Sequence, residues 1–227
     1  MMRLLTFFLP LALLPATGAG QRFFDDFDGE DLGSHWSIGN PKGGWVYSVH
    51  DSLLEVHALT GFSPRQWINA RIDELADFDM RARVGWTDTP QRQDLMVMLG
   101  NDPFLRGPFV GYMLYRRGSA GGGDSLLQAE FSGGPLRQAA APHDGFHEFR
   151  ITRNGSAFTA YLDDEIFLTG GGTTAPPTYV TLFFGGARDA TVDLFVDSVS
   201  VVPEPLSALA LIAMLGGIVP RCVRRAR

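Results

Sequence analysis

Carboxylate pairs are the first residues in this sequence that could do chemistry. Two carboxylates on one face of a strand can act as nucleophile and general acid in sugar hydrolysis, and strand alternation brings residues i and i+2 to the same face. The closest matches are Asp77 with Asp79 and Asp193 with Asp197. The first pair opens a strand whose other face is apolar, so we interpret it as a solvated face. Glu130 has no partner in the sequence, and we predict no catalytic residue.

Metal and nucleophile patterns are sparse. The histidines have no zinc-ligand spacing, and the single cysteine, Cys222, lies near the C-terminus. No Gly-x-Ser-x-Gly elbow and no phosphate loop occur. Asp25, Asp26 and Asp28 form an acidic cluster whose hard oxygen ligands suit a structural calcium ion. The alternative is an acidic loop that is merely solvated.

Aromatic residues outside the clear apolar patterns are the better candidates for binding. Aromatic rings offer flat apolar surface, and Tyr and Trp add a polar group, which together suit the C–H faces and hydroxyls of sugar rings. Ordinary packing in the core is the alternative for each of them. The predicted ligand-binding residues are Trp36, Trp45, Trp67, Tyr112 and Tyr115, with Glu130 supplying hydrogen bonds.

Short strands separated by turn residues must position these side chains. Residues 78–86 alternate, with Phe78, Met80, Ala82, Val84 and Trp86 predicted to face inward, and residues 95–99 form an apolar run typical of a central strand. Turns are expected at Asp51-Ser52, Asn154-Gly155 and Asp163-Asp164. The apolar parity changes near Asp197-Ser198, which predicts a bulge in the last strand. Residues 20–202 are therefore expected to form one all-β sandwich or barrel.

The two ends of the chain have the features of export signals. Arg3 precedes an apolar stretch from Leu4 to Leu14, and small residues follow, so residues 1–19 are predicted to be a signal peptide that the Sec translocon and signal peptidase process. Residues 203–227 begin with Pro203, Glu204 and Pro205. An apolar run from Leu206 to Val219 follows, shorter than the ~20 residues of most spanning helices. The chain ends in a basic tail of Arg221, Arg224, Arg225 and Arg227.

This order of triplet, apolar helix and arginines resembles the PEP-CTERM sorting signal of Gram-negative bacteria. The resemblance implies export, a transient inner-membrane anchor, processing by an exosortase at Pro203-Glu204-Pro205, and a final place at the cell surface or in the extracellular matrix. A plain membrane anchor that is never cleaved is the alternative.

The domain itself resembles the concanavalin A-like jelly rolls of the laminin-G-like, lectin and glucanase group. The resemblance rests on residues 146–155 and 160–165, which are similar to the "W-H-x-[YF]-x-[IV]-x-R-x-G … V-Y-L-D-G" hairpins, and on the final strand at residues 197–201. Phe146 stands in place of the usual tryptophan and Asp164 in place of the usual glycine. The Glu-x-Asp-x-x-Glu strand of the retaining glycosidases on this fold does not occur.

Charge and resemblance together leave three functions open. The formal net charge is −6, and the domain is more acidic still, because Arg3 and the tail arginines lie outside it whereas Glu204 is the only acidic residue that does. Such a domain has no basic surplus for nucleic acid. We expect a non-catalytic module that binds polysaccharide or associates with matrix. A glycan-active enzyme and a structural matrix protein without a defined ligand are the alternatives.

Overall fold

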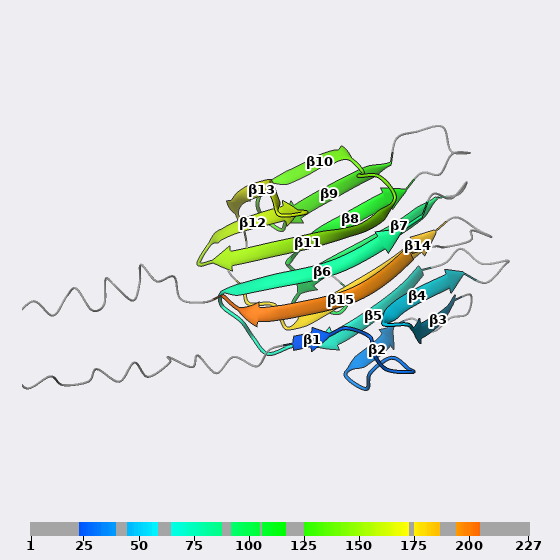
Figure 1. Cartoon of the computed structure of the whole chain (residues 1–227). Helices are drawn as coiled ribbons and strands as arrows, with labels where there is room; N and C mark the ends of the chain where they lie inside the picture. The colour runs from blue at the N-terminus through cyan, green and yellow to red at the C-terminus, as the bar shows by residue number, and fades with distance from the viewer. Residues whose placement is uncertain are drawn as a thin grey trace, which may run out of the picture.

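A computed structural model describes residues 23–39, 45–58, 65–87, 92–104, 106–116, 125–172, 175–186 and 194–204. These residues form two antiparallel sheets packed face to face (Figure 1). Sheet A has the strand order β13-β12-β11-β6-β15-β4-β3, with β1 also paired to β15, and sheet B has the order β10-β9-β8-β7-β14-β5-β2. The fold is a concanavalin A-like jelly-roll sandwich, as the sequence predicted.

The strands of sheet A are β1 (Phe23–Asp25), β3 (Trp45–His50), β4 (Leu53–Ala58), β6 (Phe78–Trp86), β11 (Gly145–Asn154), β12 (Ala157–Leu162), β13 (Glu165–Gly171) and β15 (Leu194–Pro203). The strands of sheet B are β2 (Trp36–Gly39), β5 (Arg65–Arg71), β7 (Gln93–Gly100), β8 (Phe109–Arg116), β9 (Leu126–Phe131), β10 (Leu136–Ala140) and β14 (Tyr179–Gly186). The strands β2, β5 and β10 were not expected from the sequence.

The core lies between the sheets and follows the predicted alternation. The inward-facing residues of β6 are buried, and their apolar surface drives the two layers together. β7 lies between β14 and β8 and is buried on both faces except at Met96, which confirms its central place. The predicted bulge is present, because the register of β15 on β6 shifts between Val196 and Ser198.

Two of the three predicted hairpin turns are confirmed at their positions: Asp51 and Ser52 have positive φ, as do Asp163 and Asp164. The third lies one residue later than predicted, at Gly155-Ser156, because Asn154 still pairs with Ala157 in the strand ladder, and Gly155 has φ 61°. Aspartate tolerates this left-handed conformation better than most residues, which explains how Asp164 can stand where related hairpins have glycine.

The first and last described strands lie side by side. Phe23 pairs with Val201, and the amide of Glu204 donates to the carbonyl of Asp77 at 3.2 Å. The described part of the domain therefore begins and ends at the same end of the sandwich, on the left in Figure 1. The expected signal peptide, Pro205 and the arginine tail lie outside the described residues. Within the described ranges, no helix is long and apolar enough to cross a membrane.

Candidate functional site

The outer face of sheet B carries a continuous row of side chains that changes from aromatic to polar. We call the outward-facing side chains of β2, β5, β14, β7, β8, β9 and β10 the sheet B face. Cross-strand pairing places one residue of each strand from β5 to β10 in a line: Trp67, Phe183, Met96, Met113, Gln128 and Gln138. An extended ligand lying across the strands would meet rings first, then thioethers, then amides.

Trp67 is the centre of the aromatic end. Its ring lies 4.4 Å from the Phe183 ring, centroid to centroid, and meets the Phe104 ring edge-on at 6.4 Å. Trp67 is partly exposed, and the Phe104 side chain is 41% exposed. Gly39 lies beneath them, where a Cβ atom would come within 2.9 Å of Phe104 Cε1. The glycine thus makes room for the two rings.

Tyr115 is the centre of a polar region on the same face. It is the cross-strand partner of Asp94, which Arg92 holds through two bonds of 3.0 and 2.9 Å. Burial raises the pKa of the Tyr115 phenol, Asp94 and Glu130 raise it further, and Arg92 opposes them. The phenol therefore stays protonated near neutral pH and can both donate and accept a hydrogen bond.

Amide side chains extend this polar region to the sheet edge. Gln128 Nε2 donates to Glu130 Oε2 at 2.9 Å, and Gln138 Nε2 donates to Gln128 Oε1 at 2.6 Å. The remaining lone pairs of Glu130 face outward from a half-buried side chain. The structure thus brings Trp67, Tyr115 and Glu130, which the sequence nominated separately, onto one face.

Two other nominated residues lie in the core, which corrects the prediction for them. Trp36 faces inward and its Nε1 donates to Asp25 Oδ2 at 2.6 Å. Tyr112 is fully buried, and its hydroxyl crosses the sandwich to donate to the Tyr161 carbonyl at 2.6 Å. Both rings therefore lie away from the outer faces, and their polar atoms are hydrogen-bonded within the protein. The side chain of Trp45 lies outside what the structure describes.

Asp25, one of the three acids considered for a structural calcium ion, bonds to groups of the protein itself. Asp25 accepts from the Phe27 amide at 2.7 Å and lies 2.7 Å from His35 Nε2, in addition to its bond from Trp36. Its oxygens are already occupied by hydrogen-bond partners. No group of three or more potential metal ligands occurs among the described residues. Asp25 instead ties the first strand to β2.

The sheet B face lacks the paired carboxylates of a glycosidase within the described residues. The side chains of β7 that point outward are Asp94, Met96 and Met98. The positions two and four residues after the one acid therefore carry thioethers and not carboxylates. The other acid, Glu130, lies two strands away on β9. Its cross-strand partner on β8 is Gly111, whereas the β8 partner of Asp94 is Tyr115, four residues further along that strand. At ~3.3 Å per residue these two positions are about 13 Å apart along the strands. Retaining glycosidases need about 5–5.5 Å between carboxyl groups.

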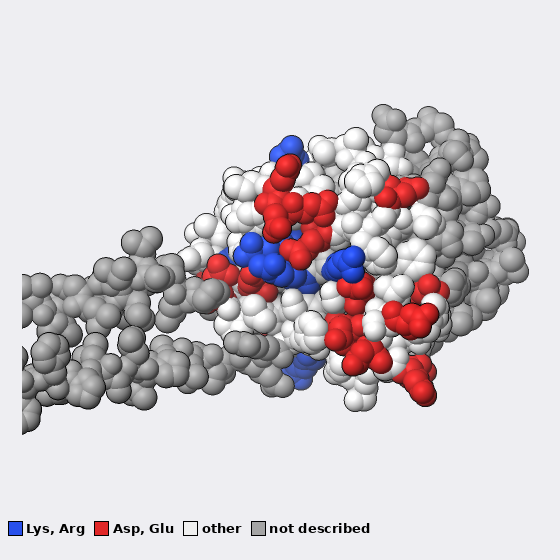
Figure 2. Space-filling model, viewed as in Figure 1, with Lys and Arg blue, Asp and Glu red and all other residues white. Residues whose placement is uncertain are grey.

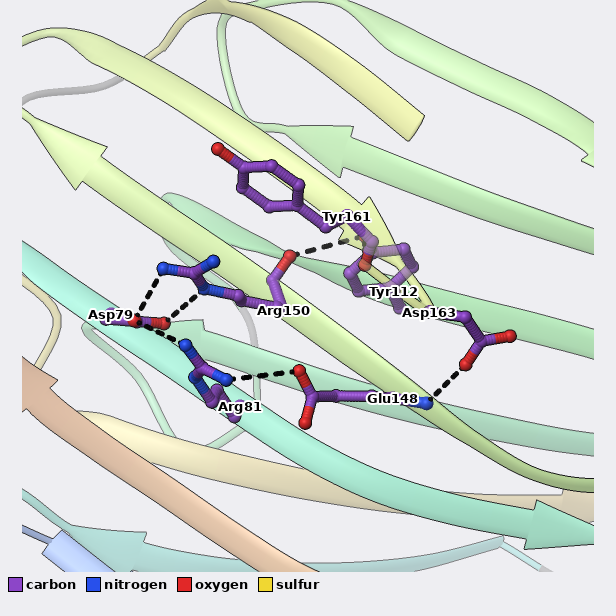
Figure 3. A network of polar contacts seen from close by, with 7 residues as sticks. All are labelled: Asp79, Arg81, Tyr112, Glu148, Arg150, Tyr161 and Asp163. Carbon is purple, nitrogen blue, oxygen red and sulfur yellow. Dashed lines mark hydrogen bonds and ion pairs between the residues drawn. The ribbon is translucent and has the colours of Figure 1, made fainter. Parts of the chain in front are cut away.

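The outer face of sheet A is polar and self-contained. Arg150 binds Asp79 through two bonds of 2.9 and 2.8 Å, and Arg81 reaches both Asp79 and Glu148 (Figure 3). Figure 2 shows this cluster as a basic centre flanked by acidic residues. Arg83 pairs with Asp197 at 3.0 Å. These charges are matched within the protein. Asp79 faces outward as predicted, but it is buried beneath the two arginines and not exposed to solvent.

Sequence reasoning missed several residues of the sheet B face. Phe183, Asp94, Asn69 and Thr181 were not nominated, and neither were Arg92 and Phe104, which lie outside these strands and contact the face from its ends. A signal was present in residues 66–72, where Ile68, Ala70 and Ile72 alternate with Trp67, Asn69 and Arg71. That period-two pattern is typical of a half-buried strand.

Comparison with known proteins supports the fold and leaves the activity open. No protein-family model matches the chain, and no curated protein matches it. Among solved structures, the chain is similar to a laminarinase from Flavobacterium sp. UMI-01, with a TM-score of 0.61 and 15% identity over 79% of this chain and 98% of the other.

Two further structures show the range of proteins on this fold. A glycoside hydrolase family 16 endo-glucanase from Bacteroides ovatus matches with a TM-score of 0.59 and 12% identity over 79% of this chain and 99% of the other. The CBM2 module of the evolved Dit of Lactobacillus casei BL23 phage J-1 matches with a TM-score of 0.62 and 13% identity over 80% and 96%. The protein is thus a concanavalin A-like β-sandwich that resembles the family 16 glucanases in fold.

Proposed function

We propose that this protein is an exported, non-catalytic β-sandwich that binds polysaccharide on its sheet B face. The observation that carries the proposal is the cross-strand row from Trp67 to Gln138. Its rings can stack on the apolar faces of sugar residues, and its amides can bond their hydroxyls. Such pairing of aromatic and polar groups on a single surface matches the amphipathic character of a glycan chain.

The relatives in fold suggest which glycans to test first. Their names describe a laminarinase and an endo-glucanase, so β-glucans are the first class of ligand for this chain. The placement of Met96 and Met98 on β7 supports binding without hydrolysis, since catalysis on this face would need a second carboxylate beside Asp94.

The test is affinity electrophoresis of the full-length chain in mild detergent with laminarin, barley β-glucan, xylan and dextran. Trp67→Ala is expected to weaken binding at least tenfold, because buried aromatic contacts dominate interface energy. Phe146→Ala is the matched control, since Phe146 is also a partly exposed ring but lies on sheet A. Equal binding by the Trp67→Ala variant and the parent chain would refute the sheet B site.

A glycan-active enzyme is the second candidate, and the likeness in fold to family 16 glucanases favours it. Release of reducing ends from any of the four polysaccharides, abolished by Glu130→Gln or Asp94→Asn, would replace the binding proposal with this one. Failure of every polysaccharide to bind or react would leave the structural matrix protein.

We also propose that an exosortase sorts the protein to the cell surface or extracellular matrix after a transient stay in the inner membrane. The support is the order of triplet, apolar run and arginines in residues 203–227. Replacing Pro203, Glu204 and Pro205 with alanine should leave the full-length protein in the membrane fraction. Identical mass and fractionation of parent and variant would instead establish a plain anchor.

A further inference from the structure

Two buried side-chain oxygens on the sheet B face have no hydrogen-bond partner among the described residues. Asn69 on β5 and Thr181 on β14 are direct cross-strand partners, 5% and 0% exposed. Asn69 Oδ1 and Thr181 Oγ1 bond to nothing in the described structure. Because most buried polar groups in proteins are paired, two unpaired neighbours at one point require a reason.

Both side chains point away from the core. The inward positions of these strands are taken by Ile68 and Ala70 on β5 and by Val180 and Leu182 on β14, all of which belong to the core cluster. Asn69 and Thr181 alternate with these residues and therefore belong to the sheet B face. They lie one row from Trp67 and Phe183, on the same pair of strands. Their burial is thus caused by something that covers the outer face.

The cover includes the ring of Phe104. This residue follows β7, yet its ring lies close to Gly39 on β2. A Cβ atom added to Gly39 would be 2.9 Å from Phe104 Cε1 and 3.3 Å from Asn69 Nδ2, so the ring and the amide are neighbours. From the end of β7 the chain therefore reaches over β14 and β5 as far as β2. Asp102 Oδ1 accepts from the Phe104 amide at 2.8 Å and braces this segment from within. Phe104 remains 41% exposed, and its ring contacts the Trp67 ring and lies under the Arg106 guanidinium.

We propose that Asn69 and Thr181 form a subsite for the hydroxyl groups of one neutral sugar residue, which binds when the Phe104 ring swings aside. This subsite rests on the polysaccharide binding proposed above. It specifies that sugar hydroxyl groups are bound beside the aromatic end of the sheet B face. Asn69 Oδ1 accepts a hydrogen bond, whereas the Thr181 hydroxyl both donates and accepts. A sugar hydroxyl also does both, so one sugar residue can satisfy both atoms while its ring lies on Trp67.

The surroundings of the pair select a neutral sugar. Its neighbours along the row are Ser37 and Met98, which carry no charge. A charged group placed here would lose hydration without a charged side chain as its direct neighbour in the row. The nearby Arg106 guanidinium, which lies 5.6 Å from the centroid of the Phe104 ring, would also repel an ammonium group, so amino sugars are disfavoured most strongly at this point of the face.

The decisive variant is Thr181→Val, which keeps the shape of the side chain and removes only the hydroxyl. Binding of laminarin and barley β-glucan by the full-length chain in mild detergent should weaken at least tenfold, with the melting temperature unchanged or raised. Thr181→Ser retains the hydroxyl and should keep most of the affinity. This combination separates the subsite from a structural role, because a hydroxyl needed for folding would lower the melting temperature when removed.

Phe104→Ala tests the cover. The variant should bind at least as tightly as the parent and associate faster, while Phe146→Ala, with the same 41% exposure on sheet A, should bind like the parent. Loss of affinity in Phe104→Ala would overturn the cover and make the ring part of the binding platform.

The outcomes separate this subsite from the broader proposal. Equal affinity of Thr181→Val and the parent would overturn the subsite and leave polysaccharide binding in place. A marked fall in the melting temperature of Thr181→Val would also overturn it, since the hydroxyl would then be paired in the folded protein. Absence of binding by the parent chain to every polysaccharide would overturn both.

Discussion

The two outer faces of the sandwich treat their polar groups in opposite ways. On sheet A, Asp79 accepts two bonds from Arg150 and a third contact from Arg81, so the charges at the centre of this face are matched. Only at the end of this network, at Glu204, is a buried oxygen unpaired among the described residues. On sheet B, Asn69 Oδ1 and Thr181 Oγ1 are unpaired near the middle of the face, beside the aromatic row. A ligand that pairs such buried groups removes the cost of leaving them unsatisfied, and this difference is a second reason why we propose binding on sheet B.

Diagonal contacts explain how sheet A reaches this balance. Arg150 lies directly opposite Arg81, a like-charge pair that would be destabilising if the side chains extended straight outward. Both instead turn toward Asp79, two residues from Arg81 on β6, as Figure 3 shows. The Arg150 guanidinium also lies over the Tyr161 ring at 5.0 Å. One carboxylate thus holds two arginines together.

Removal of that carboxylate should have the largest effect on stability. Asp79→Ala removes both bonds of Arg150 and leaves Arg81 with Glu148 as its one remaining described ion-pair partner, and we expect it to lower the free energy of unfolding by roughly 2–3 kcal/mol. Urea unfolding monitored by fluorescence measures it. Asp197→Ala is the control, because its partner Arg83 is half exposed, and such surface pairs contribute about 1 kcal/mol or less. Equal losses in the two variants would show that the Asp79 network has no special weight.

The same variant tests the contrast between the faces. Glycan affinity of the Asp79→Ala protein should equal that of the parent at temperatures where both are folded. A selective loss of affinity would place the ligand on sheet A and reverse the assignment.

Local patterns predicted sheet A much better than sheet B. The strand from Phe78 to Trp86 places apolar residues inward and charges outward, so its alternation predicts both faces at once. In β5 the polarity is partly inverted: Gln66 points inward and donates to the Gly39 carbonyl at 2.8 Å, while Trp67 points outward. An aromatic residue outside and an amide inside obscure the period of two. β10 was missed because this edge strand is largely exposed and buries almost no apolar surface.

The site was harder to predict than the fold, because it is made by pairing between distant segments. Trp67, Phe183 and Met96 come from strands that are remote in sequence and adjacent only in the sheet. Composition favoured aromatic residues as ligands, and this reasoning applied equally to Trp36 and Tyr112, which are core residues. Whether a ring lies inside or outside depended on strand parity, and β2 had not been assigned.

The tyrosines of β8 offer a matched comparison across the sheet. Tyr112 and Tyr115 are three residues apart on one strand, so alternation places them on opposite faces: Tyr112 is fully buried in the core, whereas Tyr115 lies on the sheet B face. Burial raises the pKa of Tyr112, so its hydroxyl remains a donor to the Tyr161 carbonyl. Tyr112→Phe leaves that buried carbonyl without its donor and should lower the free energy of unfolding by about 1 kcal/mol, with glycan affinity unchanged.

Tyr115→Phe should show the reverse. Within the described part of the chain its hydroxyl donates to the Met113 sulfur at 3.0 Å, a weak acceptor, so its loss should change stability little and weaken glycan binding. Thermal melts and affinity electrophoresis on the same samples measure both quantities. If Tyr115→Phe proved the more destabilising of the two, the assignment of inside and outside along β8 would be wrong.

The smallest effect is expected at Glu204, where the last strand meets the sheet A network. Burial raises the pKa of this carboxyl, nearby Asp79 and Asp77 add to the rise, and Arg150 and Arg81 oppose it. A carboxyl with a raised pKa binds its proton more tightly in the folded state. Its contribution to stability is therefore fully present below the ordinary value of 4.5 and is lost as the pH rises through the raised pKa.

At pH 7 the ionised Glu204 should thus be a slight liability, and one of its oxygens is buried without a partner. Glu204→Gln should raise the free energy of unfolding by about 0.5 kcal/mol or less at pH 7, and this gain should vanish below about pH 4, where the parent side chain is also neutral. Chemical unfolding at pH 4 and pH 7 measures the difference. Glu148→Gln is the control, because it loses the contact with Arg81 and should not gain stability. A loss of stability in Glu204→Gln at pH 7 would mean that the arginines of sheet A hold Glu204 more strongly than burial penalises it, and the matched charges of that face would then extend to the end of the domain.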